Sequence, residues 1–113
     1  MTDFEINRAL ALAIGWPPHD IDVCEDSQTV YVCTHPATLK WDALFQVFDY
    51  KAANVIWPIA ERYGHFPIQQ FHGSAKKITW KRFVWSKKKK IWMIYAAETA
   101  AKCAALAVIG IMQ

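Results

Sequence analysis

The chain has 113 residues, of which 54% are hydrophobic and 14% aromatic, and its formal net charge is +3. A chain of this length buries one modest core, which excludes a multi-domain enzyme, and its apolar content excludes an intrinsically disordered protein. We therefore predict a single domain that spans residues 1–113.

The charges are distributed unevenly along the chain. Residues 1–50 hold two basic and eight acidic side chains, a net charge of −6, whereas residues 51–113 hold eleven basic and two acidic ones, a net charge of +9. Such a chain either presents two faces of opposite sign, which would steer a charged partner toward it, or interleaves its halves so that their fields cancel.

The first half predicts a helix followed by a hairpin. The Thr2 hydroxyl and the Glu5 carboxylate form a capping pattern, and Gly15 precedes two prolines that cannot continue a helix, so we predict a helix over residues 3–14. In DIDVCEDSQTVYVC, residues 20–33, a polar turn at residues 25–28 separates two β-branched runs. This turn pairs Cys24 with Thr29 and gives the hairpin one buried face, made of Ile21, Val23, Val30 and Val32.

The rest of the chain predicts helix, strand, hairpin and helix. Residues 34–64 are expected to be helical, with Asn54 as an N-cap, Pro58 in the first turn after it and Gly64 at the end. A short strand follows over residues 67–71, and two strands bracket the four lysines at residues 87–90. An alanine-rich helix over residues 97–112 ends the chain. The expected class is α+β: one antiparallel sheet of two hairpins, on which an N-terminal, a central and a C-terminal helix pack.

The cysteines and the termini indicate a cytoplasmic protein. Cys24, Cys33 and Cys103 are an odd number without the spacing of a disulfide framework, and the start of the chain lacks the pattern of a secretory signal. The C-terminal run CAALAVIGIM is about half the roughly 20 residues that a membrane helix needs. We predict reduced thiols and no membrane partner.

The residues that could carry chemistry do not form a known pattern. The spacing of Cys24, Cys33 and His35 lacks the close cysteine pair of a structural zinc site. Asp20 and Asp22 would share one face of a strand, but a calcium loop needs more oxygen ligands. We predict no metal site, no cofactor and no catalytic residues. A small enzyme that gathers Asp20, Asp22, His35 and His65 into one site is a minor alternative.

The stretch from residue 76 to residue 92 is the main candidate for binding, because it mixes lysines with tryptophans. Proteins that bind single-stranded nucleic acid use this mixture to follow phosphates and to stack bases. A hairpin with a solvated tip uses the same residue types, and charges at its tip discourage aggregation. The residues predicted to contact a partner are Lys76, Lys77, Lys81, Arg82, Trp85, Lys87, Lys88, Lys89, Lys90 and Trp92.

Three stretches of the chain carry a family resemblance: TDFEINRALALAIGW, FDYKAANVIWPIAERYG and AAETAAKCAALAVIGIMQ. Their best motif is Phe48-Asp49 followed by Trp57-Pro58-Ile59. In this order the stretches resemble the small NinX-like proteins of tailed phages and prophages. Tyr50 stands where that family usually has proline. The resemblance implies a phage or prophage origin and an accessory role in the cytoplasm of the bacterial host, with no catalytic residues.

Together these observations predict a non-enzymatic accessory protein that binds a bacterial host protein, for example to inhibit a host defence system such as CRISPR-Cas. The alternative is a nucleic-acid-binding accessory protein that uses the basic, aromatic hairpin at residues 76–92. A homo-oligomer that packs through the C-terminal helix is compatible with both hypotheses.

Overall fold

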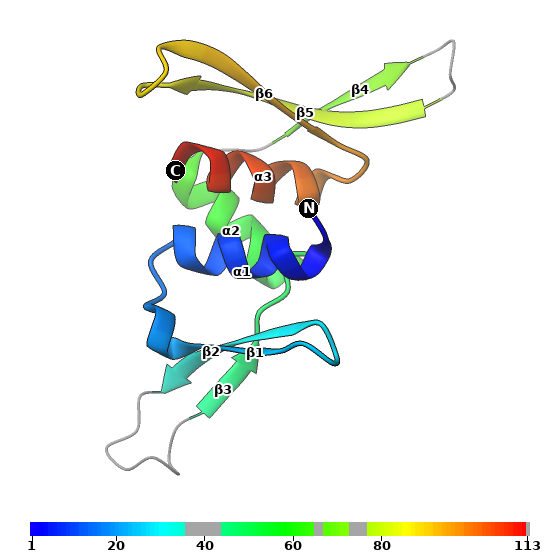
Figure 1. Cartoon of the computed structure of the whole chain (residues 1–113). Helices are drawn as coiled ribbons and strands as arrows, with labels where there is room; N and C mark the ends of the chain where they lie inside the picture. The colour runs from blue at the N-terminus through cyan, green and yellow to red at the C-terminus, as the bar shows by residue number, and fades with distance from the viewer. Residues whose placement is uncertain (36–43, 65–66, 73–76, 113) are drawn as a thin grey trace. The chain divides into compact units, whose positions relative to one another are not determined.

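The computed structural model describes residues 1–35, 44–64, 67–72 and 77–112. These residues form three α-helices and two antiparallel sheets, so the α+β class is confirmed (Figure 1). The chain divides into two compact units, Met1–Asp49 and Tyr50–Gln113. That both units belong to one domain stays a prediction.

The first unit begins with helix α1, Asp3–Ala13. The predicted capping box is confirmed: the Thr2 hydroxyl accepts a hydrogen bond from the Glu5 N–H at 3.2 Å, and the Glu5 carboxylate accepts one from the Thr2 N–H at 3.5 Å. After the helix, Gly15 has a φ of +106°, a conformation that side-chain-bearing residues rarely adopt. The helix therefore ends where the sequence predicts.

The sheet of the first unit has the order β1-β2-β3 and follows the short 3₁₀ helix Pro18–Asp20. Strands β1, Ile21–Cys24, and β2, Thr29–His35, pair in the predicted register, from Cys24 opposite Thr29 to Ile21 opposite Val32. Val30 and Val32 are buried and their partners on β1 are half-buried, so the predicted apolar face is confirmed. Helix α1 packs on β2.

Strand β3, Leu44–Val47, corrects the prediction of a helix over this part of the chain. It pairs antiparallel with β2, with Val47 opposite Tyr31 and Phe45 opposite Cys33. The residue types of Leu44, Phe45 and Val47 suit either a helix or a strand. The open edge of β2 decides for a strand, because its unpaired N–H and C=O groups can form hydrogen bonds with another strand but not with a helix. All four residues of β3 are exposed, as expected for an edge strand.

The second unit layers a sheet, helix α3 and helix α2. Strands β4, Ile68–His72, β5, Lys77–Ser86, and β6, Ile91–Ala97, form the sheet in that order. Helix α3, Ala100–Met112, packs against β5 and β6 on one side, and helix α2, Ala53–Tyr63, packs against α3 (Figure 1). Six residues of α3 are buried, which explains why its sequence is apolar on nearly every side.

The ends of α2 show one success and one error of the sequence analysis. Gly64 closes the helix with a φ of +69°, as predicted. The N-cap is Ala52 rather than Asn54, and it makes no side-chain hydrogen bond. Pro58 consequently lies inside the helix, beyond its first turn, and removes one backbone hydrogen bond there.

The two hairpins do not share a sheet, which corrects the predicted single sheet. Each hairpin recruits its own third strand, β3 in the first unit and β4 in the second. The uneven charge follows the same division, because the net charge is −6 for residues 1–49 and +9 for residues 50–113. No helix in the described ranges is long and apolar enough to span a membrane.

A glycine in α3 tests the packing of this helix on β6. A Cβ atom at Gly110 would overlap the ring and the hydroxyl of Tyr95. We expect Gly110→Ala to lower the free energy of unfolding by about 1–3 kcal/mol, as overpacking does. In a Tyr95→Ala background the tyrosine ring is gone, so the new methyl group at position 110 meets no Tyr95 ring atoms. There the same change should raise the free energy of unfolding by about 0.5–1 kcal/mol, because alanine favours a helix more than glycine does. Urea unfolding followed by circular dichroism measures both differences, and equal effects in the two backgrounds would contradict this packing.

Candidate functional site

The four lysines form the exposed turn that joins β5 to β6. The Lys90 N–H donates to the Ser86 carbonyl at 2.7 Å, and the Lys89 N–H donates to the Ser86 hydroxyl at 3.2 Å. Lys90 takes a left-handed conformation with a φ of 56°. Because the backbone of the turn is held by Ser86, the lysine side chains are free to extend into solvent, and all four are exposed. The predicted solvated tip is confirmed.

Side chains of the β5–β6 hairpin alternate between two faces of the sheet. Val84 and Ala97 point to the inner face, toward α3, and are only 4% and 7% exposed. Residues one position away point to the outer face, so a directly opposed pair such as Trp85 and Trp92 lies on that face together. The hairpin therefore carries two surfaces of different character.

The outer face carries a cluster of exposed apolar side chains, which we call the outer patch: Phe83, Trp85, Trp92 and Ile94. Trp85 lies opposite Trp92, and Phe83 lies opposite Ile94, so the four side chains form two adjacent cross-strand pairs. The two indole rings meet edge to face, with centroids 5.5 Å apart and an interplanar angle of 66°.

The outer patch has the area of the largest apolar patch on a typical folded monomer, about 300–600 Å². Its side chains are 50% (Phe83), 43% (Trp85), 64% (Trp92) and 58% (Ile94) exposed. Since a buried aromatic side chain covers about 150–250 Å², half-exposed ones leave roughly 400 Å² of contiguous apolar surface. Patches of this size on a folded chain often mark interaction sites.

Arg82 lies on the inner face instead and connects β5 to the end of α2. Its Nη2 donates a hydrogen bond to the Gly64 carbonyl at 2.8 Å. Its Nε is buried and has no hydrogen-bond partner in the part of the chain that the structure describes. The guanidinium thus binds the C-terminal end of α2, where the helix dipole favours a cation.

The structure separates the residues predicted to contact a partner into three groups. Lys81, Trp85 and Trp92 lie on the outer face, the lysines at residues 87–90 form the turn, and Arg82 points inward. Lys77 begins β5, and Lys76 lies outside the described residues. The predicted list omitted Phe83 and Ile94, although their alternation with Trp85 and Trp92 along two paired strands was the signal that could have found them.

The candidate chemical residues of the first unit are not brought together. Asp20 lies in the 3₁₀ helix rather than on β1, so it does not share a strand face with Asp22. The Asp22 carboxylate accepts a hydrogen bond from the neighbouring Val23 N–H at 3.0 Å. Cys33 is buried and Cys24 is exposed. His35 is the last residue of β2, and His65 lies outside the described residues. Among the described residues, no group of three or more His, Cys, Asp or Glu side chains could hold a metal ion.

The three free thiols differ in their chemistry. Hydrogen bonds from Ser27 lower the pKa of the exposed Cys24 thiol. Burial raises the pKa of Cys103 to about 11. The Cys103 thiol donates to the Tyr95 carbonyl at 3.2 Å, a contact between α3 and β6. Of Cys24 and Cys103, therefore, only Cys24 has an environment that favours the nucleophilic thiolate.

We expect Cys24 to react first with a chromogenic disulfide reagent, because its thiol is exposed and its pKa is lowered. The folded protein should release one equivalent of chromophore rapidly, with a rate that reaches its half-maximum at a lower pH than a free cysteine in a peptide. Cys24→Ser should abolish this fast phase, and urea should expose all three thiols of the wild type. A fast phase that survives Cys24→Ser would contradict the assignment.

A comparison of the chain with family models, with curated proteins and with solved structures found no match.

Proposed function

We propose that this chain is a non-enzymatic accessory protein of a phage or prophage, and that it binds a bacterial host protein through the outer patch. The observation that carries the proposal is the exposed cluster of Phe83, Trp85, Trp92 and Ile94 on a paired sheet. The resemblance of three stretches to NinX-like proteins supports the phage origin, the accessory role and the cytoplasm of the bacterial host as its location.

The composition of the outer patch suits a protein partner. Tryptophan is the residue most enriched among those that dominate the binding energy of protein interfaces, and lysine belongs to the rim rather than to the centre. Here the two tryptophans lie between the Phe83–Ile94 pair and the lysines of the turn. β5 is the central strand of its sheet, so the patch is held in place before binding and loses little entropy when a partner covers it.

The charge around the patch favours an acidic partner surface. Lys81 lies on the same face, and the turn adds four exposed ammonium groups. Such a rim accelerates association with a negative surface and makes the rate depend on salt. A small protein that inhibits a host defence system, CRISPR-Cas among them, can act by covering such a surface and needs no chemistry of its own.

Single-stranded nucleic acid is the second candidate, and one observation favours it. Trp92 is the most exposed side chain of the patch, at 64%, and it follows the lysine turn by two residues, so a base could stack on it while phosphates meet the lysines. Two features favour a protein instead. Ile94 offers no ring for stacking, and Trp85 and Trp92 contact each other edge to face.

The proposal predicts a partner that depends on the outer patch. Trp92→Ser combined with Ile94→Ser should remove most of the binding and leave unfolding nearly unchanged, because both side chains are more than half exposed. A matched control is Leu44→Ser with Val47→Ser, which removes two apolar side chains of comparable fractional exposure, 57% and 56%, from β3. Affinity capture from nuclease-treated bacterial lysate, read by mass spectrometry, should enrich the same acidic protein with the wild type and the control but not with the patch variant.

The purified partner then gives the quantitative test. We expect titration calorimetry to show a loss of about 10- to 100-fold in affinity for the patch variant, the range of one or two interface hot spots. Capture of the same proteins by all three chains would contradict the proposal. Fluorescence anisotropy with a labelled single-stranded oligonucleotide distinguishes the second candidate, since binding that weakens steeply between about 50 and 200 mM salt and is lost with the patch variant would favour nucleic acid.

A further inference from the structure

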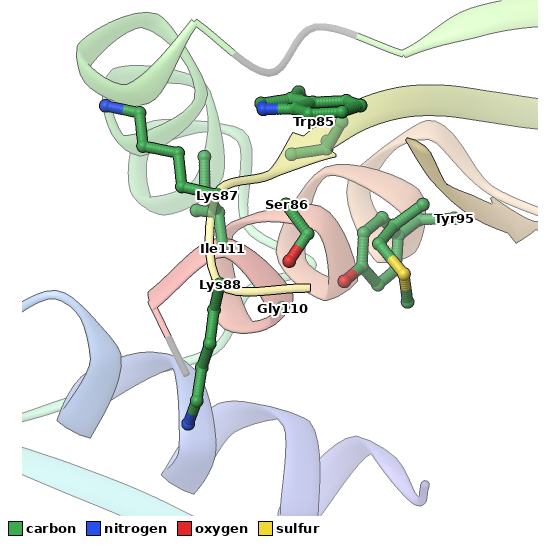
Figure 2. A pocket seen from close by; sticks show the side chains of 9 residues that line it. Trp85, Ser86, Lys87, Lys88, Tyr95, Gly110 and Ile111 are labelled. Atoms are coloured by element: carbon green, nitrogen blue, oxygen red, sulfur yellow. The ribbon is translucent and has the colours of Figure 1, made fainter. Parts of the chain in front are cut away.

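We infer that a pocket on the inner side of the β5–β6 hairpin binds a small amphipathic carboxylate, a molecule with one apolar chain and one carboxylate head. The pocket lies between the end of the hairpin and the last turn of α3, and its volume is about 300 Å³ (Figure 2). It belongs to the second unit alone. The pocket shares Trp85 with the outer patch, whereas Phe83, Trp92 and Ile94 do not line it. The inference does not rest on the proposed function, because the pocket's remaining lining comes from the turn, the inner face of the hairpin and α3.

The walls of the pocket suit an apolar chain. Val84 and Met93 come from the inner face of the hairpin, and Gly110 and Ile111 come from α3. Glycine inside a helix costs stability, yet Gly110 is required here because Tyr95 occupies the space of its missing side chain. The close approach of Tyr95 to α3 places the phenol at the pocket wall, with its hydroxyl beside the helix.

Two hydroxyl groups can donate hydrogen bonds into the pocket. Figure 2 shows the Ser86 and Tyr95 hydroxyls directed toward the space beside Gly110 and Ile111. The Ser86 oxygen already accepts a hydrogen bond from the Lys89 N–H at 3.2 Å, so its own proton is available for donation. A carboxylate accepts hydrogen bonds and cannot donate them, which makes it complementary to two donors.

The charges at the mouth favour an anion over a cation. Lys87 and Lys88 line the pocket, and Figure 2 shows their side chains leaving the turn in different directions at its rim. Each carries a full positive charge on a flexible stem, whereas the C-terminal end of α3 contributes only about half a negative charge. The balance is positive, so an anionic head should lie at the rim and the chain should extend inward.

The volume limits the ligand to a small molecule. About 300 Å³ corresponds to the space of roughly ten water molecules, and it lies at the lower end of the range of ligand pockets. A linear acid of about ten carbon atoms is a suitable probe for a pocket of this size. A two-carbon acid would leave the apolar walls uncovered and should bind far more weakly.

The test is titration calorimetry of the whole protein with sodium decanoate, kept below its critical micelle concentration. We expect saturable binding of one decanoate per chain, and no saturable binding of acetate or of decylammonium, which has the same chain and a positive head. Lys87→Gln combined with Lys88→Gln should weaken decanoate binding about 3- to 20-fold. Tyr95→Phe should weaken it about 3- to 10-fold through the loss of one donor.

The turn supplies a matched control for charge. Lys89→Gln combined with Lys90→Gln removes the same charge from the same turn at positions that do not line the pocket, and it should change the affinity less than twofold. Equal losses in the two double variants would overturn the inference, because they would indicate attraction to the basic turn as a whole. Equal binding of decylammonium, or no saturable heat with decanoate, would also overturn it. The patch variant, Trp92→Ser with Ile94→Ser, should keep decanoate binding, so the failure of one proposal is distinguishable from the failure of the other.

Discussion

The packing of α3 on the inner face of β5 and β6 is the interaction on which the second unit depends. The Cys103 thiol donates a hydrogen bond to the Tyr95 carbonyl, and the ring of Tyr95 lies against Gly110. These two contacts, about two helical turns apart along α3, join the helix to β6. Arg82 adds a third connection, from β5 to the end of α2. Buried apolar surface and these few polar contacts together align the sheet with the helices.

This packing gives the hairpin its two sides. A strand sends alternate side chains to opposite faces, so packing the buried Val84 and the half-buried Tyr95 against α3 leaves the outer patch on the other face. A strand register shifted by one residue would exchange the two sets. The outer patch is therefore a consequence of how the inner face is anchored, and the pocket near Gly110 lies between the end of the hairpin and the last turn of α3.

Local patterns predicted the elements that local physics controls. The capping box at Thr2, the glycine at residue 64 and the register from Cys24 to Thr29 were all predictable, because each depends on residues within a few positions of one another. Strand β3 was not predictable in this way. Leu44, Phe45 and Val47 suit a helix or a strand, and the open edge of β2 decides between them. The same limit explains why Arg82 was grouped with the surface lysines, since only the position of Gly64 in space shows that this guanidinium has an internal partner.

The sequence by itself determined the α+β class, the boundaries of the first helix and of the first hairpin, the solvated lysine turn and the separation of negative and positive charge into the two halves of the chain. These properties depend on periodicity, turn chemistry and composition, which are read along the chain. The tertiary structure decided which strands share a sheet, which face of β5 and β6 is covered, and that Arg82 binds a helix end whereas the lysines of the turn stay exposed. Those outcomes depend on contacts between residues far apart in sequence, and the pattern of a strand is the same whichever of its faces α3 covers.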